Sequence, residues 1–274
     1  MSTLPLQPSV FTILSALIEE RCGIHHRTEE RDLLAGKVSP LAREAGFDSL
    51  LDYYYFLRYD PRGPAELDAL IDALVVNETY FFRELQPLEV LADRVLAPVA
   101  RAGLRRARVW SAACATGEEP LTLAMVLAQR GLLGEVELVA SDISPRVLER
   151  AKQGEVTRRA LRGPVPPAYE PYLTQGSGPV RVRADVRAAV AWEQLNLVDG
   201  EALRRMGLFD AILCRNVLIY FTDATARAVV ASLTERLRPG GVLVVGTSES
   251  LLRFGTTLSC EERDGVFLYR KAGP

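Results

Sequence analysis

Two short stretches of the chain carry residue types that could hold a nucleoside. Residues 109–120 read VWSAACATGEEP, an apolar run that passes through small residues and one glycine into a helix-forming segment. Small side chains let a ligand approach the backbone closely, and the following helix has free N–H groups at its start. Residues 139–142 read VASD, an apolar run that ends in an acid. In doubly wound folds, an acid in this place binds the ribose hydroxyls of adenosine-type cofactors.

The acids in these stretches also have purely structural explanations. Asp142 could cap a helix that begins near Pro145, and Glu118 could simply favour the start of a helix. The ligand hypothesis instead assigns Asp142 to two ribose hydroxyls and Glu118 to an ammonium group. After a later strand, Asn196 and Leu197 could hold adenine by an amide hydrogen bond and an apolar contact.

A nicotinamide dinucleotide is the competing ligand, and it fits the first stretch poorly. Residues 112–117 contain one glycine instead of the Gly-x-Gly-x-x-Gly motif that lets a diphosphate approach the backbone. S-adenosylmethionine is a sulfonium compound without phosphates and does not need that approach. The residues therefore favour S-adenosylmethionine.

These residues need a scaffold, and from residue 108 onward strands and helices alternate. Such alternation predicts a mainly parallel sheet covered on both faces, with ligands bound beyond the carboxyl ends of the strands. The predicted strands are 108–111, 137–141, 189–192, 210–214, 242–246 and 267–270. The predicted helices are 119–129, 145–153 and 222–238, with a connector at 88–100.

Two segments depart from this alternation. Residues 258–263 and 266–271 flank Asp264-Gly265, which predicts a hairpin and therefore an antiparallel final strand. Residues 154–190 contain scattered proline and glycine, and we expect a small β excursion from the sheet there.

The N-terminal part, residues 1–76, predicts an all-helical domain, and 77–274 forms the predicted ligand-binding domain. Apolar residues recur at helical spacing in segments 10–20, 28–45, from residue 48, and 65–74. Gly36 and Pro40 are expected to weaken or kink the second helix. This helix carries basic residues that either form a solvated face or dock to an acidic helical partner: Arg27, Arg31, Lys37 and Arg43.

Composition excludes several other classes of protein. The 274 residues carry a formal net charge of −2, which argues against nucleic acid as the main partner. The sequence shows neither a signal peptide nor an apolar run of membrane-spanning length, so we expect a cytoplasmic protein without membrane insertion. The four cysteines are widely separated, which predicts free thiols and no metal site.

Four stretches resemble one known family. They are 77–84 (NETYFFRE), 110–120 (WSAACATGEEP), 214–221 (CRNVLIYF) and 237–241 (LRPGG), and in this order they are similar to the chemotaxis receptor methyltransferases, the CheR family. The resemblance covers nearly the whole chain. It implies an α/β protein with a Rossmann-like class I methyltransferase sheet, an antiparallel final strand, a small β element near 154–190 and an N-terminal helical domain for receptor recognition.

The resemblance also implies a reaction and the residues that serve it. Family members use S-adenosylmethionine to methylate glutamate side chains on the cytoplasmic helices of chemoreceptors, giving glutamate methyl esters and S-adenosylhomocysteine. Tyr220 matches the tyrosine that the family places beside the reacting methyl group. Carried over by position, the cofactor contacts fall on Asn77, Thr79, Arg83, Glu118, Asp142, Asn196, Leu197, Arg215 and Asn216.

The residue types agree with this chemistry. A glutamate carboxylate is already ionised at pH 7, so no general base is needed to make the nucleophile. The site must instead align a carboxylate oxygen with the methyl–sulfur axis and strip water from it. A guanidinium can hold a carboxylate through two donors and a phenol can add a third, which makes Arg83 and Tyr220 the expected catalytic pair. Arg83 could equally hold the carboxylate of the cofactor.

One stretch departs from part of the family. Some members have a longer glycine-containing loop that docks the C-terminal pentapeptide of a receptor, whereas residues 175–183 (QGSGPVRVR) look shortened. This counts against pentapeptide tethering and gives recognition by the N-terminal helices more weight. We expect a monomer that binds chemoreceptor helices. The rival hypotheses are a signalling module that binds the cofactor without turnover and a dinucleotide oxidoreductase.

Overall fold

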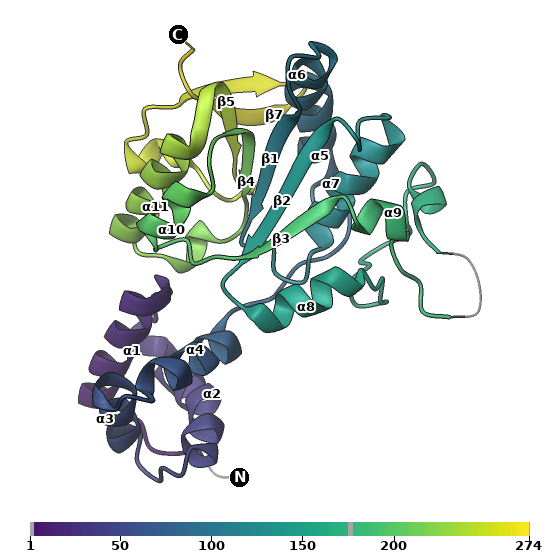
Figure 1. Cartoon of the computed structure of the whole chain (residues 1–274). Coiled ribbons are helices and arrows are strands. Elements are labelled where there is room, and N and C mark those ends of the chain that lie inside the picture. The colour runs from purple at the N-terminus through teal and green to yellow at the C-terminus, as the bar shows by residue number, and fades with distance from the viewer. Residues whose placement is uncertain (1–2, 175–177, 274) are drawn as a thin grey trace. The chain divides into compact units, whose positions relative to one another are not determined.

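The computed structural model describes residues 3–174 and 178–273 (Figure 1). The chain divides into two compact units. The helical unit comprises Met1–Val76 together with Tyr220–Thr225, and the sheet unit comprises Asn77–Ile219 together with Ala226–Pro274. Over the described ranges, none of the helices has the length and apolar character needed to cross a membrane.

The helices of the helical unit are those that the apolar spacing predicts. They are α1 (Pro8–Cys22), the 3-10 helix η1 (Thr28–Glu30), α2 (Arg31–Glu44), α3 (Leu50–Tyr59) and α4 (Gly63–Leu74). Local chemistry sets several ends: α1 ends at the left-handed Gly23, and the Ser49 side chain caps α3. The α2 helix continues through Pro40.

Side chains from all four α-helices fill the core of the helical unit. The fully buried ones include Leu14, Ile18, Val38, Tyr53 and Leu70. The buried Tyr53 keeps a hydrogen-bond partner, because its hydroxyl donates to Oε1 of Glu66 at 2.7 Å. A β-bridge joins Ile24 to Phe221 within this unit.

A seven-stranded sheet in the order β3-β2-β1-β4-β5-β7-β6 organises the sheet unit. The strands from β3 to β5 in this order pair in parallel, whereas β7 is antiparallel to β5 and β6 is antiparallel to β7. The bounds are β1 (Ala107–Ala112), β2 (Val136–Asp142), β3 (Val190–Gln194), β4 (Phe209–Cys214), β5 (Leu237–Val244), β6 (Ser259–Arg263) and β7 (Val266–Arg270). The predicted Rossmann-like α/β sheet with an antiparallel final strand is therefore confirmed.

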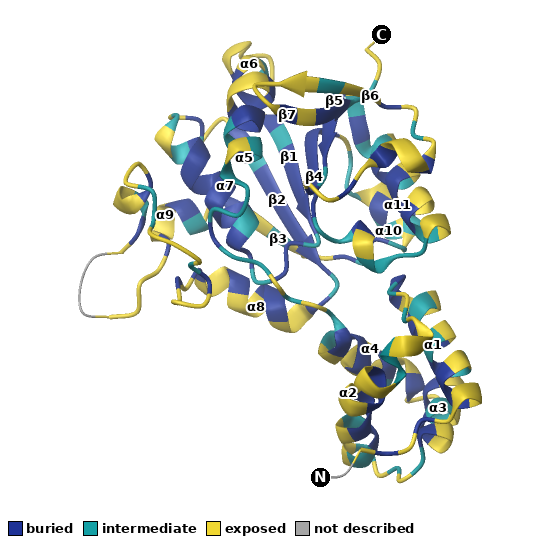
Figure 2. Cartoon of the chain, turned by 180° about the vertical axis from the view of Figure 1, so that it is seen from behind, coloured by how far each residue is buried: buried dark blue, intermediate teal, exposed yellow. Residues whose placement is uncertain are grey.

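Helices cover both faces of this sheet. Figure 1 shows α10 (Gly200–Arg205) and α11 (Asp223–Arg236) on one side, and α5 (Leu85–Leu91) and α7 (Glu118–Gln129) on the other. The π-helical segment η2 (Ala92–Leu96) and α6 (Ala97–Arg101) continue α5, and α8 (Pro145–Gln153) follows β2. Figure 2 shows β1, β2 and β4 buried along most of their length, as their apolar sequences require.

The structure corrects the sequence interpretation in two places. The helix expected to reach residue 238 ends at Arg236, because β5 begins at Leu237. Among the described residues of 154–190, the predicted β excursion is reduced to the bridges Glu155–Arg181 and Leu173–Val182, with η3 (Glu170–Tyr172) and α9 (Ala184–Arg187). Residues 175–177, which belong to the stretch expected to be short, lie outside the described residues.

Candidate functional site

The carboxyl ends of the parallel strands meet at one edge of the sheet unit. Ala112 at the end of β1 is in register with Ser141 on β2 and with Cys214 on β4. The segments that follow these ends contain most of the polar residues that the sequence predicts for a ligand. We use the name carboxyl edge for the ends of the parallel strands β1 to β5, the segments that follow these ends and the residues bound to those segments.

The loop after β1 is held in an unusual backbone conformation. Ala113 and Ala115 have φ angles of 56° and 48°, and Gly117 has a φ of 89°. A Cβ atom at Gly117 would lie 2.6 Å from Cβ of Ala151 and 2.9 Å from the ring of Trp192. Glycine is therefore required at this position both for its backbone angle and for lack of space. The loop approaches its neighbours as closely as its small residues predict.

Asp142 fastens this loop to the end of β2. The residue is 7% exposed, and its carboxylate accepts hydrogen bonds from the N–H groups of Ala115 at 2.8 Å and Ser144 at 3.0 Å. The side chain of Ser144, not that of Asp142, caps α8 by accepting from the N–H of Val147. Ser144 is thus the N-cap of α8, and Asp142, which accepts the N–H of that cap residue, is a buried acid of the carboxyl edge.

Glu118 begins α7 and is buried as well. Only 6% of the residue is exposed, and its Oε2 accepts from the hydroxyl of Thr116 at 2.7 Å. Burial raises the pKa of Glu118, because the charged form loses its water. A cationic group bound nearby would stabilise the charged form again.

Arg215, the first residue after β4, links three segments of the carboxyl edge. Its side chain is 2% exposed, and its two Nη atoms donate to Glu119 Oε2 at 2.7 Å and to Glu84 Oε2 at 2.8 Å. Glu119 also accepts from the hydroxyl of Ser111 at 2.7 Å. Burial lowers the pKa of Arg215, but the two carboxylates outweigh that effect and raise it. Within the described chain its Nε is buried without a hydrogen-bond partner.

The segment 77–84 enters this network from the other direction. Phe82 and Glu84 are left-handed, with φ angles of 63° and 46°. Glu84 accepts from Arg215 and, at 3.1 Å, from the hydroxyl of Thr247. Phe82 N–H donates to the hydroxyl of Thr122 at 3.2 Å and its ring stacks on Tyr169. These contacts stabilise a backbone that would otherwise be strained.

The other predicted residues of this segment are Arg83, within the turn, and Asn77 and Thr79, before it. Arg83 donates from Nη1 to the carbonyl of Glu78 at 3.2 Å, and its guanidinium lies 5.5 Å from the ring centroid of Tyr80. Asn77 and Thr79 are half-buried in irregular backbone. The cofactor role of Asn77, Thr79 and Arg83 stays a prediction.

The predicted adenine residues follow β3, and their loop is fastened to β2. Leu195 N–H donates to the carbonyl of Asp142 at 2.9 Å. Asn196 accepts from Val198 N–H at 3.2 Å through Oδ1, and Leu197 is buried. Asn196 and Leu197 therefore lie close to Asp142, as a nucleoside site requires.

Tyr220 ends the 3-10 helix η4 (Leu218–Tyr220), which follows the β4 loop. Because Tyr220 is grouped with the helical unit, its pairing with Arg83 stays a prediction.

Glu249 is an acid of the carboxyl edge that sequence reasoning missed. It is 9% exposed and accepts from the N–H groups of Asn216, Leu218 and Gly246, at 2.7 Å, 2.8 Å and 2.8 Å. The available signal was an acid soon after a predicted strand, behind the small residues of 246–248, which repeats the pattern of the first loop.

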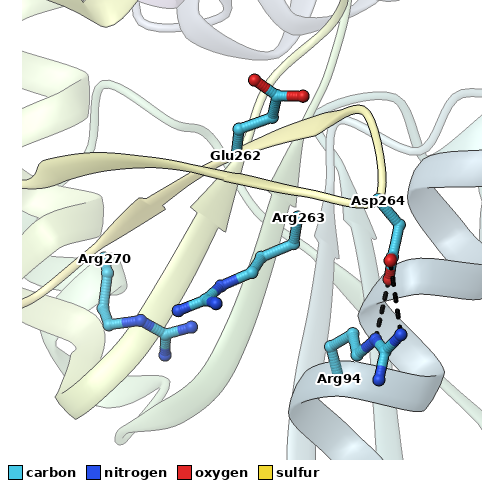
Figure 3. Close-up of a pocket in the computed structure, with 5 residues that line it drawn as sticks. All are labelled: Arg94, Glu262, Arg263, Asp264 and Arg270. Carbon is cyan, nitrogen blue, oxygen red and sulfur yellow. Dashed lines mark hydrogen bonds and ion pairs between the residues drawn. The ribbon is translucent and has the colours of Figure 1, made fainter.

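A surface cavity of about 430 Å³ lies at the β6–β7 hairpin, and its lining residues are Arg94, Glu262, Arg263, Asp264 and Arg270, none of which belongs to these loops (Figure 3). Its arginines already have acidic partners: Arg94 pairs with Asp264 at 2.7 Å, and Arg270 pairs with Glu261 at 2.8 Å. Arg263 pairs with the same Glu261 at 3.3 Å. The charges of this cavity are therefore compensated, and it does not compete with the carboxyl edge as a ligand site.

Two family models match the chain. The one described as "CheR methyltransferase, all-alpha domain" matches residues 10–75, and the one described as "CheR methyltransferase, SAM binding domain" matches residues 77–266. The second range contains all the predicted cofactor residues.

Curated relatives agree with these matches over most of their length. A chemotaxis protein methyltransferase of Klebsiella aerogenes is 38% identical over 254 residues, covering 90% of this chain and 85% of the relative. Chemotaxis protein methyltransferase 1 of Pseudomonas aeruginosa is 35% identical, covering 88% and 90%. The chemotaxis protein methyltransferase of Escherichia coli is 35% identical, covering 90% and 86%.

Proposed function

The chain belongs to the CheR methyltransferase family, and from this premise we propose that it methylates glutamate side chains of chemoreceptors. It is an S-adenosylmethionine-dependent methyltransferase; the products are glutamate methyl esters and S-adenosylhomocysteine. The observation that carries the proposal is the match of the SAM-binding model to residues 77–266, which include the whole carboxyl edge.

The residues of the carboxyl edge fit the cofactor. The side chains of residues 113–115 extend no further than a thiol, and Gly117 has none, so the loop can lie close to a nucleoside. Asp142 would accept from the ribose hydroxyls, and Asn196 with Leu197 would hold the adenine. Glu118 would attract the ammonium group, and the buried Nε of Arg215 suits a carboxylate.

When bound, S-adenosylmethionine supplies an electrophilic methyl group on a sulfonium sulfur. The chain itself must hold the acceptor carboxylate in line and keep water away from it. Arg83 is suited to this because its guanidinium is oriented by Glu78 and Tyr80, and Tyr220 would add one more donor. A carboxylate held too tightly is a poorer nucleophile, so orientation should contribute more than tight binding.

We also propose that the helical unit recognises the receptor. Arg27 and Lys37 are exposed on and before α2, and Arg31 and Arg43 are half-buried there. Basic side chains of this kind complement acidic receptor helices. Tethering to a C-terminal pentapeptide is not part of the proposal, and we propose that the enzyme acts as a cytoplasmic monomer.

The test uses S-adenosylmethionine with a labelled methyl group and a fragment of a chemoreceptor. Carboxyl methyl esters release labelled methanol in base, whereas methylated nitrogen does not. Label that enters only base-stable products would contradict the proposal. Binding of S-adenosylhomocysteine without any transfer of label would point instead to a signalling module.

The two roles open to Arg83 can be separated with Arg83→Ala. If Arg83 holds the acceptor carboxylate, the KM for the receptor fragment rises and the Kd for S-adenosylhomocysteine stays the same. If it holds the cofactor carboxylate, that Kd rises by about tenfold or more.

A further inference from the structure

Asn216 has a backbone conformation that needs outside support. Its φ of 59° is left-handed, which asparagine tolerates better than most residues but which still costs free energy. Its neighbour Arg215 is held by ion pairs with Glu84 and Glu119. The fixed position of Arg215 restricts the backbone angles that Asn216 can adopt. Such a conformation persists only where surrounding groups determine it.

Glu249 provides this support from the loop after β5. Its two carboxylate oxygens accept from the N–H groups on either side of Val217, with Oε2 taking Asn216 at 2.7 Å and Oε1 taking Leu218 at 2.8 Å. The strands that carry the two loops are paired, with Leu213 of β4 in register with Val244 of β5. The buried acid therefore joins adjacent loops of the carboxyl edge by charge-assisted hydrogen bonds.

Gly246 packs closely against both Asn216 and Glu249. Its N–H donates to Oε2 of Glu249 at 2.8 Å, and Glu249 N–H returns a bond to its carbonyl at 2.9 Å. A Cβ atom at Gly246 would lie 2.5 Å from Nδ2 of Asn216 and 2.9 Å from Oε2 of Glu249. Its φ is not in the left-handed region, so lack of space, not backbone angle, requires glycine here.

We infer that Glu249 is a positioning residue of the cofactor site, which acts through Asn216. Its carboxylate fixes the backbone of Asn216, and Gly246 leaves room for the Asn216 amide. The inference rests on the proposed function, since Asn216 is one of the proposed cofactor contacts. Glu249 itself need not touch the cofactor.

The test is Glu249→Gln, with S-adenosylhomocysteine binding measured by calorimetry. A glutamine directs an NH₂ group at one of the backbone N–H donors. The substitution therefore weakens the hydrogen bonds that hold the Asn216 backbone, while side-chain size is kept. We expect the Kd to rise by about tenfold, and KM for S-adenosylmethionine to rise more than kcat falls. In an Asn216→Ala background the same substitution should change the Kd little.

Asp210→Asn is the matched control. Asp210 is a buried acid at the other end of β4, it is 5% exposed, and it also accepts a backbone N–H, that of Arg108 at 2.9 Å. This variant should lower the unfolding midpoint as Glu249→Gln does, but bind S-adenosylhomocysteine like the wild type.

The outcomes separate the inference from the proposed function. A wild-type chain that does not bind S-adenosylhomocysteine would contradict the proposed function. If the wild type binds and the folded Glu249→Gln variant has a Kd within about twofold of the wild-type value, the inference is overturned. The loss of these hydrogen bonds predicts a larger increase in Kd. If Glu249→Gln does not fold, Gly246→Ala decides: tighter crowding of Asn216 should weaken binding, and wild-type affinity would overturn the inference.

Discussion

Buried acids lie at both ends of β4, but the charged groups and hydrogen-bond donors around them differ. At the start of the strand, Asp210 accepts from the guanidinium of Arg105 and from the N–H of Arg108. Burial alone raises the pKa of Asp210, but these donors outweigh it and lower the pKa. At the carboxyl edge, Arg215 joins two acids, and Glu118 nearby keeps a pKa that burial has raised.

The two edges of the sheet also differ in which residues adopt left-handed backbone angles. The loops that lead into β1, β2 and β4 reach left-handed angles at Gly103, Gly131 and Gly207. Apart from Gly117, the carboxyl edge reaches them at residues with side chains: Phe82, Glu84, Ala113, Ala115 and Asn216. Glycine adopts such angles without strain, whereas other residues need supporting contacts. The carboxyl edge therefore depends on its polar network to hold these angles, whereas the loops at the opposite edge reach them at glycine.

The largest expected effect comes from removing the central cation of this network. Arg215→Met leaves the half-buried Glu84 and Glu119 without their cation, which should lower the free energy of unfolding by about 3 kcal/mol. Arg105→Met at the opposite edge should cost less, about 1–2 kcal/mol, because the buried Asp210 keeps the N–H of Arg108 as a donor and still has Arg238 at 4.0 Å. Chemical denaturation measures both, and equal losses would remove the distinction between the two edges.

The second largest effect is a difference in stability between alanine substitutions at two left-handed glycines, Gly117 and Gly207. Gly117→Ala places a Cβ atom 2.6 Å from Ala151 as well as straining the backbone, so about 2–3 kcal/mol should be lost. At Gly207 the nearest atom is the flexible end of Arg108, at 2.9 Å, and Gly207→Ala should cost about 1 kcal/mol. Thermal unfolding compares the two variants; a smaller loss for Gly117→Ala than for Gly207→Ala would contradict the packing argument.

A smaller effect concerns pH and Glu118. A carboxyl group whose pKa is raised on folding favours the folded state fully below its ordinary pKa of 4.5, and this contribution is lost as pH rises through the folded pKa. Glu118→Gln should therefore be more stable than the wild type at pH 7, with the difference fading toward pH 4. The same variant should bind S-adenosylhomocysteine about tenfold more weakly, because the ammonium group loses its counter-charge.

Calorimetry over this pH range tests both halves of the prediction for Glu118. Wild-type affinity should fall as the pH is lowered and Glu118 takes up a proton, whereas the affinity of Glu118→Gln should change less. Unchanged affinity in the variant would mean that Glu118 only starts the helix.

The smallest effect is expected at the hairpin, where Asp264 is also left-handed. Its ion pair with Arg94 is exposed on both sides, with 60% and 49% of the side chains accessible. Arg94→Ala should leave both the unfolding midpoint and S-adenosylhomocysteine binding unchanged. A loss of affinity would show that left-handed acids outside the carboxyl edge also serve the site.

Local patterns predicted much of this arrangement. The apolar spacing predicted α1 to α4, and the alternation of elements predicted the parallel strands whose ends form the carboxyl edge. The alternation also led to Asp142, but it did not identify Ser144 as the cap of α8. The end of α11 was missed because a helical apolar pattern continues to Leu237, and only pairing of that residue with Phe209 assigns it to β5.

The sequence by itself determined the order of the elements, the small loop after β1 and the acids near the strand ends, because these depend on residues close together in the chain. Only the tertiary structure decided which acid holds which loop. Glu84 meets Arg215 across 131 residues, and Glu249 meets Asn216 across 33. Such pairs depend on the register of neighbouring strands and on the path of each loop, and no local pattern specifies either.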